Sequence, residues 1–171
     1  MRSLFFVICF LLVVDYSFGQ SFQKYQIGSS GCAAYFFCNP GKFILDKSPD
    51  SSEVYTGECT NDDITYGVIC VKLKDKLSGM ETSESVLIAY LDYLKGSFNI
   101  TKSAGYGKGH KLGNRDDTRG VIDYWQDKSN ANWKVKGWTD GTFIAVMYAK
   151  SAKELPEIKI NTFLDGLVLP H

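Results

Sequence analysis

The chain has 171 residues, and its 19 basic and 19 acidic side chains give a formal net charge of zero at pH 7. A neutral chain has no electrostatic footprint for nucleic acid or for an anionic membrane surface, so we expect neither as a partner. Hydrophobic residues make up 44% of the chain, which is ordinary for a globular protein with a substantial core.

The first residues have the pattern of a cleavable secretory signal peptide. Arg2 supplies a positive charge, residues 4–14 (LFFVICFLLVV) are all apolar, and the small residue Gly19 ends the segment. The apolar run is shorter than the roughly 20 residues that span a bilayer, and no later segment comes close, so we expect no membrane span. These features predict a signal peptide at residues 1–19. They also predict a secreted or periplasmic chain that forms one globular domain at residues 20–171.

Turn signals and short apolar runs alternate in the first half of the mature chain. Strands are predicted at 42–46, 53–58 and 65–73, and the turn between the last two makes them a hairpin. A helix is predicted at 82–98, where apolar side chains recur every three or four residues: Val86, Leu87, Tyr90, Leu91, Leu94 and Phe98.

The cysteines of the mature chain predict disulfides. One of the five cysteines lies within the leader, which leaves Cys32, Cys38, Cys59 and Cys70. An even number in an exported protein predicts two disulfides, and four cysteines allow three pairings. The predicted hairpin places Cys59 opposite residues near Thr65 and far from Cys70, which disfavours a Cys59–Cys70 bond and leaves two pairings open. Of these two we favour Cys38–Cys59 with Cys32–Cys70. The spacings contain no C-x-x-C and no nearby histidine, so we expect no metal site and no cofactor.

The second half of the chain begins with three predicted strands. A strand at 118–126 is followed by strands at 132–139 and 142–149. The last two flank Asp140-Gly141, which is typical of a two-residue hairpin turn of the type-I′ class. We therefore expect these two strands to pair directly.

This hairpin predicts a register and a position within the sheet. A two-residue turn places Trp138 opposite Phe143. Residues 142–149 are apolar on both faces, as expected of a strand inside a sheet that is covered on both sides. A final helix is predicted to begin near Pro156, with a buried stripe of four residues: Ile160, Phe163, Leu164 and Leu167.

These elements predict an α+β fold, with a single antiparallel β-sheet, helices packed on both faces and an N-terminal section stapled by disulfides. The segments W-T-D-G-T-F-I-A-V-M-Y-A at 138–149 and F-L-D-G-L at 163–167 resemble the final strand and C-terminal helix of the PsbP-like fold. That resemblance implies an α/β/α sandwich around an antiparallel sheet. The fold serves several unrelated roles, so the resemblance implies architecture and not activity.

Residues 103–117 contain the first candidate binding surface. Within this segment, residues 105–111 read G-Y-G-K-G-H-K, and the lysine is not followed by the Ser or Thr that a phosphate-binding loop requires. Glycine-rich loops can still supply binding surfaces. The segment therefore predicts Tyr106, Lys108 and His110 as binding residues.

Trp138 is the fourth candidate binding residue. It shares a strand face with Lys134 and Lys136, which suggests that this face is partly exposed to water. Trp138 is then either an exposed aromatic anchor for a partner or a residue of the core. Trp133 lies on the opposite face of the same strand and is predicted to be core.

Asn99-Ile100-Thr101 fits the acceptor sequence for N-linked glycans. The motif matters only in a eukaryotic source.

The sequence predicts a binding protein rather than an enzyme. His110 is the one credible imidazole for catalysis, and the chain has no G-x-S-x-G nucleophile elbow, so no catalytic residue is predicted. We expect an exported, soluble binding or interaction domain whose partner is another protein, with an inhibitor or immunity role included. The alternative is an extracellular or periplasmic hydrolase, or a carbohydrate-binding domain, that uses the loop at 103–117.

Overall fold

The computed structural model describes residues 22–170, so the predicted signal peptide at 1–19 lies outside the described residues. Within this range the chain forms eleven strands and two helices. In chain order they are β1 (Gln23–Gln26), β2 (Ala33–Phe36), β3 (Ile44–Lys47), β4 (Glu53–Asn61), β5 (Ile64–Lys72), α1 (Met80–Ser97), β6 (Ile100–Ser103), β7 (Gly107–His110), β8 (Arg119–Asp127), β9 (Asn132–Thr139), β10 (Phe143–Ser151), α2 (Glu157–Leu164) and β11 (Leu167–Val168).

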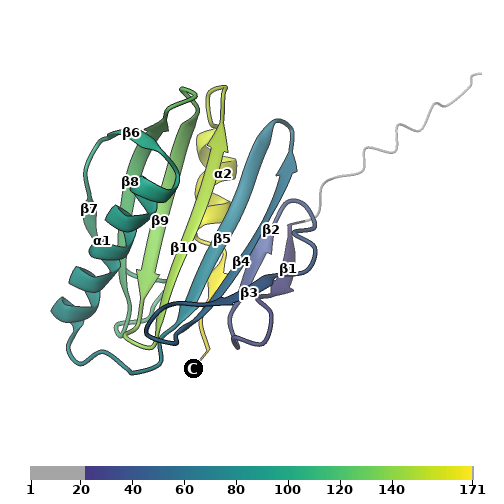
Figure 1. Cartoon of the computed structure of the whole chain (residues 1–171). Coiled ribbons are helices and arrows are strands. Elements are labelled where there is room, and N and C mark those ends of the chain that lie inside the picture. Colours follow the sequence, from purple (N-terminus) through teal and green to yellow (C-terminus); the bar gives the residue numbers. More distant parts are fainter. Residues whose placement is uncertain (1–21, 171) are drawn as a thin grey trace, which may run out of the picture.

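Eight strands form one antiparallel sheet at the centre of the molecule (Figure 1). Seven of them follow the order β3-β4-β5-β10-β9-β8-β6, and β7 also pairs with β8. Strand β10 lies between β5 and β9, and every residue of it except Lys150 is buried. Its burial on both faces explains why its sequence is almost continuously apolar, and confirms the prediction of a strand inside the sheet.

The two faces of this sheet are covered by different elements. Helix α1 packs on one face over β8 and β9, and it lies in front of the sheet in Figure 1. Helix α2 packs on the opposite face over β10 and β9. The predicted α+β class, with an antiparallel sheet between helices, is therefore confirmed.

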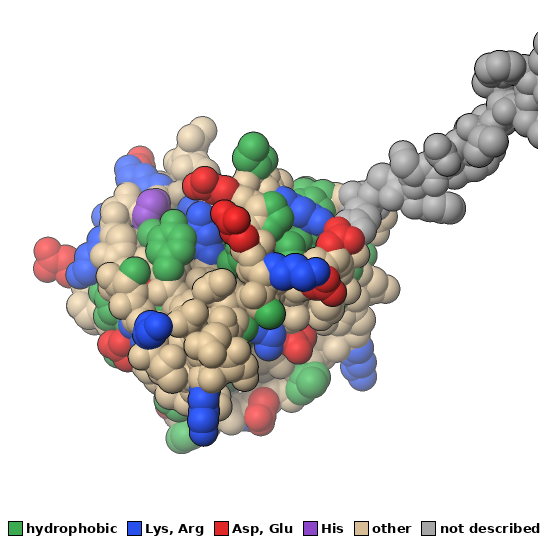
Figure 2. Space-filling view, turned by 90° about the horizontal axis from the view of Figure 1, so that it is seen from above, with side chains coloured by type: hydrophobic (Ala, Val, Ile, Leu, Met, Phe, Trp, Pro, Cys, Tyr) green, Lys and Arg blue, Asp and Glu red, His purple; other side chains and the backbone are tan. Residues whose placement is uncertain are grey.

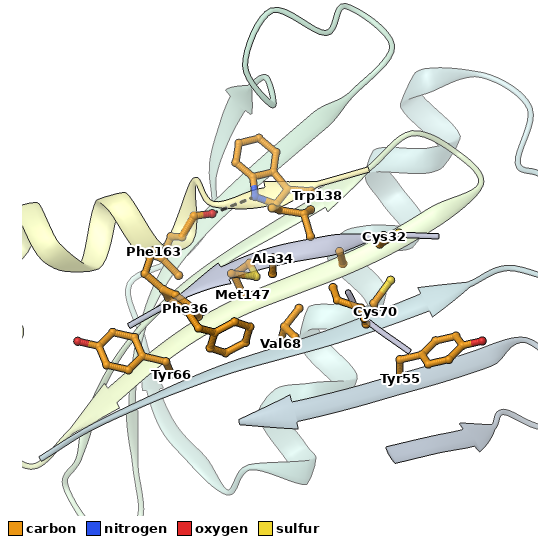
Figure 3. Packing of buried hydrophobic residues seen from close by; sticks show 14 of the residues in the cluster. Cys32, Ala34, Phe36, Tyr55, Tyr66, Val68, Cys70, Trp138, Met147 and Phe163 are labelled. Carbon is orange, nitrogen blue, oxygen red and sulfur yellow. Dashed lines mark hydrogen bonds between the residues drawn. The ribbon is translucent and has the colours of Figure 1, made fainter. Parts of the chain in front are cut away.

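The prediction of a single sheet is wrong, because three strands form a second, small sheet in the order β1-β2-β11. Strand β2 pairs with β11 through Ala34 and Leu167, which are far apart in the sequence. Side chains of this small sheet and of α2 share one core with the main sheet, as Figure 3 shows for Ala34, Phe36, Val68 and Phe163. The short run of apolar residues near Cys32 is thus a strand whose partner no local pattern identifies.

The β9–β10 hairpin has the predicted faces but a different register. Trp138 lies opposite Ala145 and not opposite Phe143. The side-chain oxygen Oδ1 of Asp140 accepts hydrogen bonds of 2.9 Å from the backbone N–H groups of Thr142 and Phe143, so the connection is longer than a two-residue turn. The register differs by two residues, and a shift of two leaves every side chain on its predicted face.

One of the two predicted disulfides is present. Cys38 and Cys59 are bonded, which suggests that the protein matures in an oxidising compartment. Cys32 and Cys70 are buried thiols, so the prediction of a second disulfide is wrong for this structure. The two thiols are in contact, and this contact lowers the pKa of Cys32 and raises that of Cys70.

We expect two thiols to titrate when the oxidised protein is unfolded without a reductant, and neither to react quickly in the native protein. Both side chains are 0% exposed, so a thiol reagent reaches them only after unfolding. Titration with a chromogenic disulfide in native buffer and in guanidinium checks this. Absence of any thiol in the unfolded protein would show that Cys32 and Cys70 are also bonded.

No helix among residues 22–170 is long and apolar enough to cross a membrane.

Candidate functional site

A cleft of about 530 Å³ lies between the sheet and the segment that joins β10 to α2. Strands β8 and β9 form one wall, and the start of α2 with its preceding residues forms the other. The lining residues are Tyr124, Trp125, Asn132, Trp133, Lys134, Glu154, Leu155, Glu157 and Ile160. Clefts of this size, with a few polar groups around an aromatic ring, are the usual form of a ligand site.

Strand pairing brings the two most distinctive side chains of the cleft together. Tyr124 on β8 lies directly opposite Lys134 on β9, so both side chains point to the α2 face of the sheet. Helix α2 packs over β9 and β10, while β8 lies closer to the sheet edge. The ring of Tyr124 is therefore 49% exposed although it lies on the same face as the core.

Lys134 combines a buried side chain with a charge that has no counterion. The residue is 6% exposed, and its ammonium nitrogen lies 5.1 Å from the centre of the Tyr124 ring. No carboxylate of residues 22–170 lies within ion-pair distance of it. The ammonium nitrogen keeps contact with solvent, because the Tyr66 hydroxyl is the one fully buried side-chain polar atom without a partner among the described residues. It can therefore pair with an acceptor or anion that enters the cleft.

The opposite wall presents acceptors to the same space. Glu154 and Glu157 are exposed and line the cleft, and Asn132, the first residue of β9, adds an amide from the sheet side. Figure 2 views the molecule from the end where the β8–β9 turn lies. It shows basic, acidic and hydrophobic side chains next to one another rather than one area of a single charge. The cleft can therefore hold a ligand that offers both charge signs, or hydroxyl groups, beside an apolar surface.

Two of the predicted binding residues, His110 and Trp138, lie near the other end of β8. His110 on β7 pairs with Gly120, and the absence of a side chain at Gly120 leaves room for the Trp138 ring and the His110 Cβ. Trp138 is 1% exposed, and its Nε1 donates a hydrogen bond of 3.3 Å to the carbonyl oxygen of Leu164, drawn as a dashed line in Figure 3. Trp138 is thus a core residue and not an exposed anchor.

The other two, Tyr106 and Lys108, attach their loop to α1. The Tyr106 hydroxyl donates a hydrogen bond of 2.5 Å to Asp92 and accepts one of 2.8 Å from Lys95. The Lys108 ammonium lies 3.2 Å from Glu84. The structure therefore does not bring the four predicted residues into one site, and these two contacts hold the loop in place.

A buried carboxylate organises the same region. Asp123 is 0% exposed and accepts hydrogen bonds from the Ser103 hydroxyl at 2.7 Å and the Trp125 Nε1 at 2.6 Å. The Lys95 ammonium lies 3.1 Å from the same carboxylate, and the backbone N–H of Gly105 donates to it at 3.1 Å. This network joins β8, α1 and the start of the 103–117 loop, and its groups are used for structure.

The hydrogen bonds decide the charge of Asp123. Burial alone would raise the pKa of this carboxyl group, but donors from Ser103, Trp125 and Lys95 outweigh burial, so the pKa lies below its ordinary value. The group is therefore an anion at neutral pH. The negative charge also keeps Lys95 in place between α1 and β8.

The sequence contained part of the signal for the cleft. Lys134 lies on a strand face that the sequence predicts to be partly exposed to water, and Tyr124 is one of several aromatic residues in the predicted strands between 118 and 149. Glu154 and Glu157 gave no such signal, because acidic residues just before a helix and in its first turn are typical of a helix start as well as of a site. No group of three or more His, Cys, Asp or Glu residues among 22–170 is placed to hold a metal ion.

No protein-family model, no curated protein and no solved structure matches this chain.

Proposed function

We propose that this protein is an exported binding domain without catalytic activity, which recognises a protein partner through the cleft beside Tyr124 and Lys134. The unpaired ammonium of Lys134 in the cleft carries this proposal. An inhibitor or immunity role is one form that such an interaction can take.

Charge complementarity favours a segment of a protein as the occupant. Lys134 can pair with a carboxylate of the ligand, while Glu154 and Glu157 on the other wall can pair with a basic group of the ligand. A peptide segment with acidic and basic side chains offers both within a short distance. Between them, the exposed ring of Tyr124 supplies the kind of aromatic contact that dominates protein interfaces.

A carbohydrate is the second candidate, and two observations favour it. A half-exposed tyrosine ring can stack on a sugar face, and two carboxylates in one cleft match the residue types that glycoside hydrolysis uses. Both glutamates are exposed to solvent, whereas a catalytic acid needs a shielded environment. This contrast supports binding over hydrolysis.

The test is capture from the secretome of the source organism with the mature domain as bait. We expect a specific protein to bind the wild type and to be lost with Lys134→Met and with Tyr124→Ala. Each substitution should weaken binding by about 2 kcal/mol, which is roughly a 30-fold loss of affinity. Because the contact includes ion pairs, added salt should also weaken binding of the purified partner.

Tyr93→Ala is the matched control, since Tyr93 is a tyrosine that is 66% exposed on α1, on the other side of the sheet. It should retain the partner at wild-type affinity. Equal capture by the wild type and by both cleft variants would contradict the site. Binding of a neutral oligosaccharide that is insensitive to salt, with no captured protein, would favour the second candidate.

A further inference from the structure

The connection between α1 and β6 contains a motif that the proposed binding function does not use. Asn99 lies two residues after the end of α1, and Asn99-Ile100-Thr101 is an acceptor sequence for N-linked glycans. Asn99 and Thr101 are both exposed. The cleft lies on the opposite face of the sheet from α1, so this motif is independent of the proposed function.

The backbone of Asn99 is fixed while its side chain is free. Its φ angle is 54°, a left-handed conformation that asparagine adopts readily after a helix end. Its N–H donates to the carbonyl oxygen of Gly96 at 3.2 Å, and its own carbonyl accepts from the N–H of Lys128 at 3.0 Å. No described hydrogen bond uses the side-chain amide, so its nitrogen is available for modification.

The surroundings leave space for a bulky group. Strand β6 pairs only with β8 among the described strands and forms one edge of the main sheet. The Thr101 hydroxyl donates to the carbonyl oxygen of Gln126 at 3.1 Å, which keeps the motif on that edge. A glycan at Asn99 would lie beside an unpaired edge strand, where a covering group also opposes edge-to-edge association.

We propose that Asn99 carries an N-linked glycan when the chain passes through a eukaryotic secretory pathway. The donor is a lipid-linked oligosaccharide diphosphate. The Asn99 Nδ2 forms a bond to the anomeric carbon of the donor as the bond from that carbon to the diphosphate oxygen breaks. Nδ2 loses one proton, the lipid diphosphate leaves, and no group is oxidised or reduced.

The test is the mass of the secreted protein. The full chain, including its leader, is expressed in animal cells, and the intact mass is measured before and after treatment with a peptide N-glycosidase. We expect a mass above that of the polypeptide, which the enzyme removes while it converts Asn99 to aspartate. The unmodified mass would overturn the proposal, whether the protein is recovered from the medium or, if it is retained, from the membrane fraction of the cells.

Two threonine variants separate the modification from folding. Thr101→Ala removes the acceptor motif but keeps Asn99 and its left-handed backbone, so its product should have the unmodified mass. Thr101→Ser keeps the motif and should remain glycosylated. A glycan that persists in Thr101→Ala would place the modification elsewhere and overturn the assignment.

Discussion

Replacing Trp138 with alanine should lower the free energy of unfolding by about 3–5 kcal/mol, the usual range for removing a buried aromatic ring. The indole lies between β9 and the end of α2, and Gly120 on β8 makes room for it. Truncation would leave a cavity and remove the donor to the carbonyl oxygen of Leu164. The main sheet and the helix are both fixed by other contacts, so the cavity cannot close fully.

Urea unfolding followed by far-ultraviolet circular dichroism measures this loss. Tyr124→Ala is the matched control, because Tyr124 lies on the same face of the sheet but is 49% exposed. Its substitution should change the free energy of unfolding by less than about 1 kcal/mol. Equal unfolding midpoints for Trp138→Ala and the wild type would contradict the burial of this ring.

Local periodicity explains which parts of the fold were predictable. The central strand β10 is apolar on both faces, and its position inside the sheet follows from that pattern, although the pattern does not identify β5 as its second neighbour. The faces of the β9–β10 hairpin were also predicted, because alternation depends on each strand alone. The register was not, since it depends on how the Asp140 side chain holds the turn.

Features that depend on distant residues were not predictable in this way. The pairing of Ala34 with Leu167 joins segments near the two ends of residues 22–170, and neither segment is long enough to identify its partner. The candidate cleft is formed by Tyr124 and Lys134 on a hairpin and by residues at and before the start of α2, so its parts meet only in space. The glycines of the loop at 103–117 predict a binding surface, but Tyr106 and Lys108 attach this loop to α1.

The resemblance to the PsbP-like fold stays a prediction. The observed antiparallel sheet between helices agrees with the α+β class that the resemblance implies. The small sheet of β1, β2 and β11 has no counterpart in that expectation.

Replacing Asp123 with asparagine should also destabilise the protein by about 3–5 kcal/mol, because it breaks a buried ion pair and leaves Lys95 without its buried counterion. The carboxylate accepts hydrogen bonds from Ser103 and Trp125 and from backbone N–H groups. An asparagine amide has one acceptor oxygen, and its NH2 group would face donors. The 103–117 loop should lose its attachment to β8 first, and faster amide hydrogen exchange at Gly105 would report this.

Asp92→Asn is the matched control, because Asp92 contacts the same Lys95 and Tyr106 while its side chain is 60% exposed. It should change stability by less than about 1 kcal/mol. Because the folded-state pKa of Asp123 is lowered, its stabilisation is present above the unfolded pKa of about 3.9 and is lost as the pH falls through the folded pKa. The difference in unfolding free energy between the wild type and Asp123→Asn should therefore shrink below about pH 4. Urea midpoints of all three proteins at neutral and acidic pH measure it, and a difference that does not vary with pH would mean that Asp123 is not the ionised centre of this network.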